Sequence, residues 1–518
     1  MMTERSRIIA NAIASYGRSL VALALGLFSA RWILEGLGQS DFGLYGVVGG
    51  IIVFITFLNT TLSGAISRFF AYAVGRTRVI GEDQGKRELN EWFNTALCVH
   101  SIIPFVLVVI GYPIGSYAIQ HWLVIPDDRL TACLMVFRFS VFSAFIGMVS
   151  VPYTALFTAF QLIFELSFLN IAHTIVSFLF AYSLLSFSGD RLVYYAEYMM
   201  GVSIAFTIGT ILWAHFRFKM CRLDFSLWFN IERFKSFFTF AGAKFFGAIC
   251  VVLRTQGGCL LLNRFFLPQV NAAYSISMQV SSHTSSLSQA LVGALQPAVA
   301  NREGGADREG MLRMAETSCR MASLLVVIVA IPMLIEIEWL LVAWLKNVPY
   351  YAITFCACMV VLLILDKMSI GYMLAANAYG KKMIFYELTN GILLMSSLPI
   401  SYIFFHLGYP PYYLAISLCF TWGMYSVARV VFCRWQLGVS MRNWVFKVAL
   451  PVIVLSVLAY LFGSIWKQYL ASSFLRVVLV TCTTSIVILF VGPLLVLSKS
   501  ERKMMAEGFA KVKGKFKL

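Results

Sequence analysis

Apolar stretches long enough to cross a lipid bilayer recur along the whole chain, and this recurrence limits the fold more than any other feature. About 20 mostly apolar residues span the hydrocarbon core as a helix, and hydropathy indicates fourteen such stretches. The predicted spans are 10–34, 43–71, 93–118, 131–156, 162–187, 193–216, 239–262, 270–299, 315–345, 352–376, 384–405, 412–432, 447–466 and 474–497. Only 13% of the 518 residues are charged, against about 25% in soluble domains. The sequence therefore predicts an all-α polytopic membrane protein.

Basic residues are distributed unevenly over the loops between these spans. One set of loops, together with both chain ends, holds lysine and arginine clusters at 5–7, 76–87, 217–235, 302–313, 381–382, 434–447 and 499–517. The other loops hold only Arg129, Arg191, Arg264, Lys346, Lys467 and Arg476. Because basic loops stay in the cytoplasm, both termini are predicted inside. The net charge of +17 then reflects membrane topology rather than nucleic-acid binding.

An internal repeat divides the chain. LSGAI at 62–66 matches LVGAL at 291–295, and Tyr45 and Tyr274 precede the two segments at the same offset of 229 residues. Parallel repeats are a common plan of secondary transporters, with the substrate site between them near the midplane. We predict pseudo-symmetric six-helix lobes at 1–222 and 239–433, a linker at 223–238, two additional helices within 434–497, and a basic cytoplasmic tail at 498–518.

Two segments are amphipathic. DFSLWFNIERFKSFF at 224–238 alternates aromatic and charged residues, which is typical of a helix lying in the membrane interface. The tail places Met505, Phe509, Val512 and Phe516 at helical spacing among lysines. The tail is either an anchor at an anionic lipid surface or a frayed, solvated end.

No catalytic, cofactor or metal-binding pattern is visible. Most of the eleven cysteines fall inside apolar runs, which is ordinary for packing residues, and the six histidines are scattered. A membrane glycosyltransferase or polymerase needs a hydrophilic domain or loop with paired carboxylates or a metal site. The predicted outer loops are too short for one, so we do not expect an enzyme.

The segment LEGLGQSDFGLYGVVGGIIVF at 34–54, after a long first span, resembles the MATE-like flippase superfamily of multidrug, oligosaccharidyl-lipid and polysaccharide exporters, in its polysaccharide-biosynthesis branch. The resemblance implies two six-helix bundles, often with two extra C-terminal helices. It implies flipping of undecaprenyl-pyrophosphate-linked oligosaccharides across the bacterial cytoplasmic (inner) membrane for O-antigen of lipopolysaccharide, capsule or exopolysaccharide. The expected partners are this lipid-linked cargo, membrane lipids, and a polysaccharide polymerase with its chain-length machinery.

Charged residues inside the spans are the candidate substrate ligands. Arg18 lies within the stretch 8–34 and cannot lose its charge, so it should face protein or a wet cavity. Lys244 and Arg254 lie on the first span of the second lobe, ten residues or about 15 Å apart. If both spans face a central cavity, these cations suit a pyrophosphate, whereas the alternative is structural pairing between helices. Arg18 also resembles the first-helix arginine of the peptidoglycan-precursor branch, and Arg138 is a further candidate.

The other intramembrane charges have simpler interpretations. Arg31, Arg68, Arg320 and Arg429 are close enough to span ends to extend toward water. Glu165 is expected to pair with a neighbour or reach the interface, and Asp366 and Lys367 to form a local pair.

The eighth span is unusually polar, with serines, threonine, histidine and glutamine between 275 and 289. Ser281 and Ser285 are candidates for binding sugar hydroxyls, and Asn59 is their counterpart in the first lobe. The alternative is that these side chains join helices to one another.

A cation-coupled multidrug antiporter of the same fold is the alternative function. Such exporters use membrane-embedded carboxylates, but the first and seventh spans have none in their apolar cores. Asp366 in the tenth span remains the candidate ion-coupling carboxylate.

Overall fold

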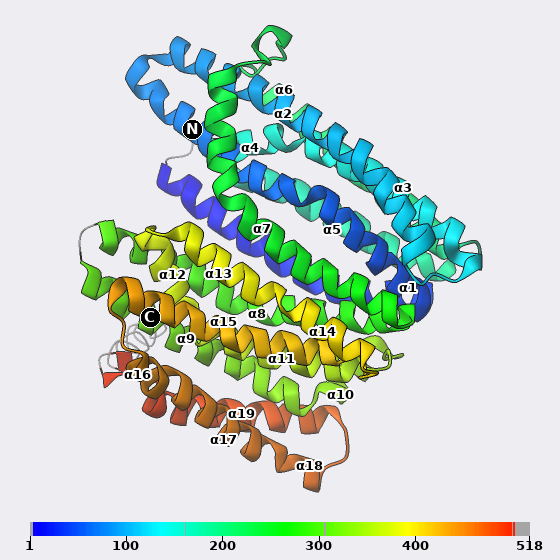
Figure 1. Cartoon of the computed structure of the whole chain (residues 1–518), viewed down its shortest axis with the longest axis vertical. Coiled ribbons are helices and arrows are strands. Elements are labelled where there is room, and N and C mark those ends of the chain that lie inside the picture. The colour runs from blue at the N-terminus through cyan, green and yellow to red at the C-terminus, as the bar shows by residue number, and fades with distance from the viewer. Residues whose placement is uncertain (1–3, 161, 305–306, 500, 503–518) are drawn as a thin grey trace, which may run out of the picture. The chain divides into compact units, whose positions relative to one another are not determined.

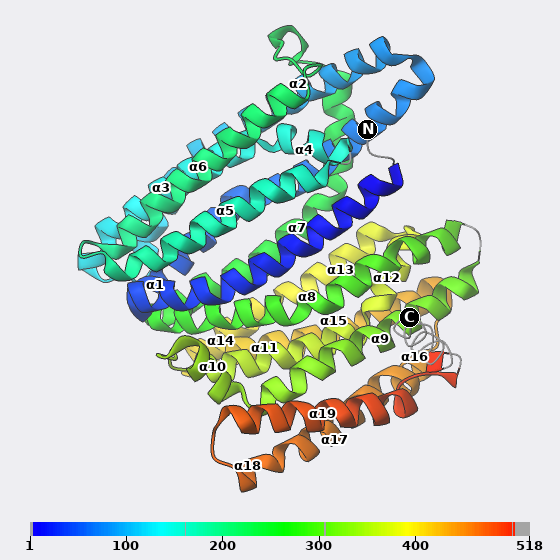
Figure 2. The ribbon, with the colours of Figure 1, turned by 180° about the vertical axis from the view of Figure 1, so that it is seen from behind.

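The computed structural model describes residues 4–160, 162–304, 307–499 and 501–502. Every regular element within these ranges is helical, so the prediction of an all-α chain is confirmed. The chain divides into two compact units, Met1–Ala272 and Ala273–Leu518, which are called the N-terminal unit and the C-terminal unit below. Figure 1 shows the helices coloured along the chain, and Figure 2 shows the reverse side.

The N-terminal unit is built from long helices lying side by side. Its elements are α1 (Glu4–Ile80), α2 (Glu82–Tyr117), η1 (Ala118–Trp122), η2 (Asp127–Arg129), α3 (Leu130–Val149), α4 (Val151–Ala159), α5 (Ile163–Ser183), η3 (Leu184–Ser186), α6 (Arg191–Arg217), η4 (Phe225–Leu227) and α7 (Ile231–Phe265). Helix α1 packs on α5 and α7, and α3 packs on α6. Helix α8 (Pro268–Gly304) starts at the end of this unit.

Helix α1 is two helices joined at Gly38. The backbone there has φ 75° and ψ 169°, a conformation that is essentially restricted to glycine. The first two predicted spans, 10–34 and 43–71, therefore lie on the two halves of α1, and the break falls in the gap between them.

Replacing Gly38 by alanine should lower the stability of the folded protein by about 1–3 kcal/mol, because alanine is strained at this φ and ψ. Nothing lies within 4 Å of the added methyl group, so the cost is in the backbone alone. Gly49→Ala is the control, since its methyl group also meets open space in ordinary helix. Thermal unfolding of the purified variants should separate them, and equal midpoints would contradict the assignment.

Polar contacts join several helix ends of the N-terminal unit. Arg129 Nε donates to Asp41 Oδ1 at 3.0 Å, and Arg129 Nη1 donates to Asp190 Oδ2 at 2.9 Å. Asn263 Oδ1, near the end of α7, accepts from the backbone N–H of Val124 at 2.9 Å. These five residues define the clamped end of the unit. Burial raises the pKa of Asp190, but the hydrogen bonds from Arg129 and from the first turn of α6 outweigh it and leave that pKa below its usual value.

The segment between α6 and α7 is held against α2. Asn94 Nδ2 donates to the Arg222 carbonyl at 2.8 Å, and its Oδ1 accepts from the Asp224 N–H at 2.8 Å. The predicted amphipathic segment 224–238 consists of the 3₁₀ turn η4 and the first two turns of α7, which Asn230 caps. The segment is therefore not a separate helix, and its location in the membrane interface stays a prediction.

The C-terminal unit contains the rest of α8 and twelve further helical elements among its described residues. They are α9 (Arg308–Ile335), α10 (Ile337–Leu345), α11 (Ala352–Lys367), α12 (Ile370–Tyr379), α13 (Met383–Met395), α14 (Ser397–His406), α15 (Tyr413–Leu437), α16 (Met441–Trp444) with η5 (Val445–Ala449), α17 (Leu450–Ser464), α18 (Trp466–Tyr469) and α19 (Phe474–Leu495). Helices α11, α12 and α13 contact α15, whereas α17 and α19 contact α9.

Two buried ion pairs fasten the last helices to α9. Arg476 Nη2 on α19 donates to Glu336 Oε2 at 2.7 Å, and Arg320 Nη2 on α9 donates to Glu501 Oε1 at 2.9 Å. Arg320 is 6% exposed, so the expectation that it extends toward water is wrong. Hydrogen bonds from Thr317 and Arg320 outweigh burial and hold the pKa of Glu501 below its usual value.

Residues 503–518, which include Met505, Phe509, Val512 and Phe516 of the predicted anchor, lie outside the described residues.

The chain is a multi-pass membrane protein. Among the described residues, nine helical stretches are long and apolar enough to cross a membrane, and the bent pair of α11 and α12 makes a tenth if it counts as one span. All fourteen predicted stretches lie on helical segments. The number of crossings, their orientation and the predicted lobe boundaries stay predictions.

Candidate functional site

Four of the predicted substrate-binding cations lie on helices of the N-terminal unit. Arg138 is nine residues along α3 from Arg129, and Arg254 is nine residues along α7 from Asn263. Since Arg129 and Asn263 belong to the clamped end, a rise of 1.5 Å per residue places both cations about 13 Å from that end.

The other two cations lie farther along their helices from the clamped end. Arg18 is twenty residues before the Gly38 break in α1, and Lys244 is nineteen residues before Asn263 in α7. Both positions are therefore about 30 Å from the clamped end along their helices, which is close to the thickness of a bilayer core. Arg18, Lys244, Arg138 and Arg254, called the cation ladder below, therefore lie at two levels along these helices, about 30 Å and about 13 Å from the clamped end.

The environments of these side chains differ. Arg18 and Arg254 are half-buried. Arg138 is exposed, and its Nε donates to the Tyr112 hydroxyl on α2 at 3.0 Å. The side chains of Lys244 and Asn59 lie outside the described residues.

The serines of α8 divide into two groups. Ser285 is buried, and its hydroxyl donates to the Ser282 carbonyl of its own helix at 3.0 Å. Ser277, Thr284 and Ser288 are bonded to their own helix in the same way. Ser281 is half-buried. This bond within α8 engages the Ser285 hydroxyl, so Ser281 is the better placed of the two for a ligand.

The C-terminal unit contains a buried ionic centre. Asp366 Oδ1 accepts from Arg429 Nη1 at 2.8 Å and from the Trp422 indole N–H at 3.2 Å. Its other oxygen accepts from Lys367 Nζ at 2.7 Å. Asp366, Lys367 and Arg429 are 7%, 4% and 3% exposed. The predicted pair of Asp366 and Lys367 is confirmed, whereas the expectation that Arg429 extends toward water is wrong.

This centre lies where α11 ends and α12 begins at an angle of 48°. Arg429 Nη1 also reaches the Asp366 carbonyl at 3.3 Å and the Ser369 hydroxyl at 3.2 Å, so it bonds backbone and side chain at the break. Gly371 permits the close packing of α12 on α9, because a methyl group there would meet the Ala315 carbonyl oxygen at 1.8 Å. The ionic centre therefore holds a bent helix in place. A coupling cation at Asp366 would have to displace Lys367 or Arg429.

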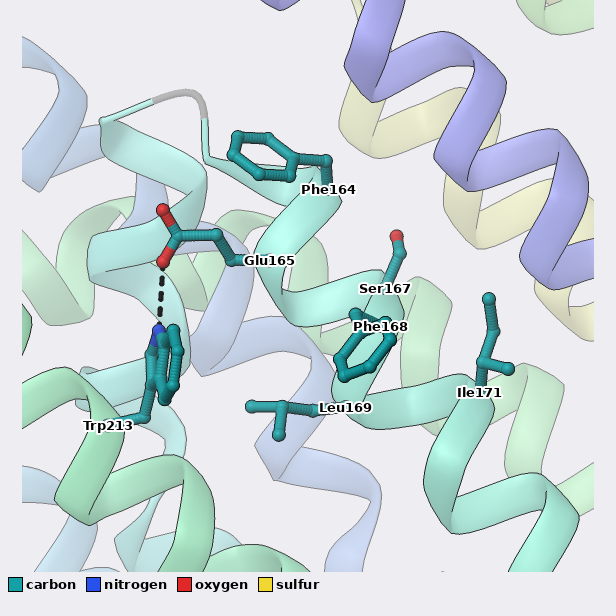
Figure 3. A pocket seen from close by; sticks show the side chains of 7 residues that line it. All are labelled: Phe164, Glu165, Ser167, Phe168, Leu169, Ile171 and Trp213. Carbon is teal, nitrogen blue, oxygen red and sulfur yellow. Dashed lines mark hydrogen bonds between the residues drawn. The ribbon is translucent and has the colours of Figure 1, made fainter.

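A groove in the N-terminal unit lies between α5 and α6 and has a volume of about 460 Å³. Figure 3 shows the Glu165 carboxylate facing the Trp213 indole, with Phe168 farther along α5 beside Ser167. The indole N–H donates to Glu165 Oε2 at 2.8 Å, and Arg217 Nε donates to Oε1 at 3.4 Å. The expectation that Glu165 pairs with a neighbour is confirmed. Its charge is already matched by Arg217, and the rest of the groove is almost wholly apolar.

Comparisons with known proteins identify the fold. No family model matches the sequence, and neither does any curated protein. Among solved structures, the lipid II flippase MurJ in an inward closed conformation aligns with a TM-score of 0.67 at 12% identity, covering 94% of this chain and 98% of that one. The chain has the MATE-like flippase fold.

Two further structures share this fold. An inward-facing multidrug resistance MATE family transporter of the MOP superfamily aligns with a TM-score of 0.66 at 12% identity, covering 80% of this chain and 94% of that one. A MOP superfamily transporter from Pyrococcus furiosus, for which a reverse polarity of the binding pocket suggests a different function, aligns with a TM-score of 0.58 at 11% identity, covering 84% and 96%. The fold thus occurs in transporters of lipids and of drugs.

Proposed function

We propose that the protein flips undecaprenyl-pyrophosphate-linked oligosaccharide repeat units across the bacterial cytoplasmic membrane, for export of a surface polysaccharide, by alternating access. The observation that carries the proposal is the cation ladder on α1, α3 and α7. The predicted span in α1 and the α7 span that holds Lys244 and Arg254 contain no carboxylate in their apolar cores. Neither span therefore supplies a carboxylate of its own to these cations.

A pyrophosphate fits the spacing and chemistry of these cations. Guanidinium groups bind phosphate oxygens through two parallel hydrogen bonds, and an ammonium group binds them as a compact charge. Arg18 and Lys244 meet the head group at the side of the basic loops, and Arg254 and Arg138 meet it about 15 Å farther across the membrane. The polyprenyl tail stays in lipid throughout.

The drug antiporter alternative is less well supported. A path lined by cations repels cationic drugs. Coupling to sodium or protons needs an accessible carboxylate, and Asp366 is buried and bonded to two cations. The proposal therefore does not use Asp366 for ion coupling.

Complementation tests the function. A bacterium that lacks its own surface-polysaccharide flippase, and expresses the full chain, should regain surface polysaccharide on immunoblots and lose accumulated lipid-linked precursor. A panel of such strains with different repeat units is needed, because the sugar specificity is open. Failure in every strain, together with raised resistance to cationic drugs in an efflux-deficient strain, would overturn the proposal in favour of the antiporter.

A further inference from the structure

A second groove, between α13 and α15 of the C-terminal unit, differs in charge from the groove of Figure 3. It has a volume of about 300 Å³, within the range of about 300–1,000 Å³ for ligand pockets. Its wall consists of Phe385, Tyr386, Thr389, Asn390, Ala428, Val431, Phe432 and Trp435. No charged residue is among them, and the Glu165–Arg217 pair has no equivalent in this lining.

Cations lie at the mouth of this groove. The Lys382 Nζ is 4.0 Å from the centre of the Trp435 ring, and Trp435 lines the groove. Arg434, one residue before Trp435, and Arg442 line a separate surface pocket of about 420 Å³ at the end of α15. These residues belong to the basic loops that are predicted to face the cytoplasm. The mouth is therefore positive, and the groove leads from it along an apolar, aromatic wall.

Two buried polar groups on the groove wall have no hydrogen-bond partner among the described residues. They are the Tyr386 hydroxyl and the Asn390 amide nitrogen, on residues that are 3% and 4% exposed. Leaving such donors unbonded is costly. Asn390 lies seven residues into α13, about 10 Å from its start, and Tyr386 lies three residues in, about 5 Å from its start.

We propose that this groove binds one anionic phospholipid from the leaflet that faces the basic loops. The phosphate contacts Lys382, one acyl chain lies along Phe432 and Trp435, and an ester carbonyl accepts a hydrogen bond from Tyr386 or Asn390 after a small side-chain movement. The charge of the mouth argues for a negatively charged lipid rather than a zwitterionic one. The site holds a membrane lipid and is independent of the exported cargo.

Native mass spectrometry of the full chain, with phosphatidylglycerol and phosphatidylcholine in competition, tests the site. The wild type should retain one phosphatidylglycerol molecule that Lys382→Asn retains about tenfold less often, since one charge-assisted contact is lost. Asparagine tolerates the left-handed backbone of this position, where φ is 53°. Ala428→Trp should fill the groove without changing charge and lower retention equally.

Lys381→Asn is the matched control, because Lys381 contacts the Tyr379 ring rather than the groove. If Lys381→Asn lowers phosphatidylglycerol retention as much as Lys382→Asn does, the lipid is attracted to basic residues in general. That result would overturn the site. Unchanged retention in Lys382→Asn and Ala428→Trp would also overturn it. Displacement of phosphatidylglycerol by equimolar undecaprenyl pyrophosphate would assign the groove to the cargo instead, and so contradict the proposal.

Discussion

Arg254→Ala and Arg18→Ala should each slow the flipping of polyprenyl-pyrophosphate cargo by about 10- to 100-fold, because a hydrogen bond to a charged group contributes about 1.5–3 kcal/mol. Both side chains are half-buried in spans without a balancing carboxylate. Lysine at either position should restore part of the rate, since it keeps the charge but lacks the paired donors of arginine. The measurement is quenching of a fluorescent lipid-linked oligosaccharide in proteoliposomes, at matched protein density.

Arg217→Ala is the control for general loss of positive charge. Arg217 is on the same unit, but its guanidinium is 51% exposed and pairs with Glu165. Its removal should leave the rate within about twofold, since exposed pairs contribute little. Unchanged rates in both Arg18→Ala and Arg254→Ala would remove these residues from the substrate path, even if the wild type transports the cargo.

Asp366→Ala should destabilise the protein by about 3–5 kcal/mol, because it leaves Lys367 and Arg429 buried without their counter-charge. Both cations are less than 5% exposed, so water cannot replace the carboxylate without opening the helix packing. Thermal unfolding in detergent and the amount of folded protein in membranes should both fall. Combining Asp366→Ala with Arg429→Met should cost less than the sum of the single changes, since the two residues interact directly.

Glu165→Gln is the comparison for this second prediction. Its partner Arg217 is half exposed, so the expected cost is below about 1 kcal/mol. A similar loss of stability in Glu165→Gln and Asp366→Ala would contradict the structural role of the buried ionic centre. Wild-type stability of Asp366→Ala combined with loss of transport would instead point to ion coupling.

Much of the fold could be predicted from the sequence because its main signals are local. Apolar length marked each helical stretch, and the gap between 34 and 43 marked the break between the first two. The same approach wrongly predicted that the side chains of Arg320 and Arg429 extend toward water. Both lie near helix ends, where extension toward water is ordinary, and their partners are far away along the chain, 181 residues for Glu501 and 63 for Asp366.

The functional residues show the same limit. The sequence identified the cations of α1 and α7 as unusual, but their distances from a common helix end depend on contacts such as Arg129–Asp41 and Asn263–Val124. The serine-rich α8 suggested a sugar-binding wall, whereas Ser285 satisfies its own helix. Trp422 was missed entirely, because a tryptophan in an apolar span gives no signal of a bonded carboxylate.

The two ion pairs that join α9 to α19 and the residues after it cannot form until the end of the chain has been synthesised. Glu336 and Arg320 leave the ribosome well before Arg476 and Glu501, which follow them by 140 and 181 residues. At a translation rate of about 5–20 residues per second, synthesis of the 140 residues from Glu336 to Arg476 takes roughly 7 to 28 s. During that interval two charges on nascent α9 depend on water, the translocation channel or a chaperone. A premature stop codon after α15 would make the delay permanent, so such a product is a substrate for membrane proteases rather than a shorter transporter.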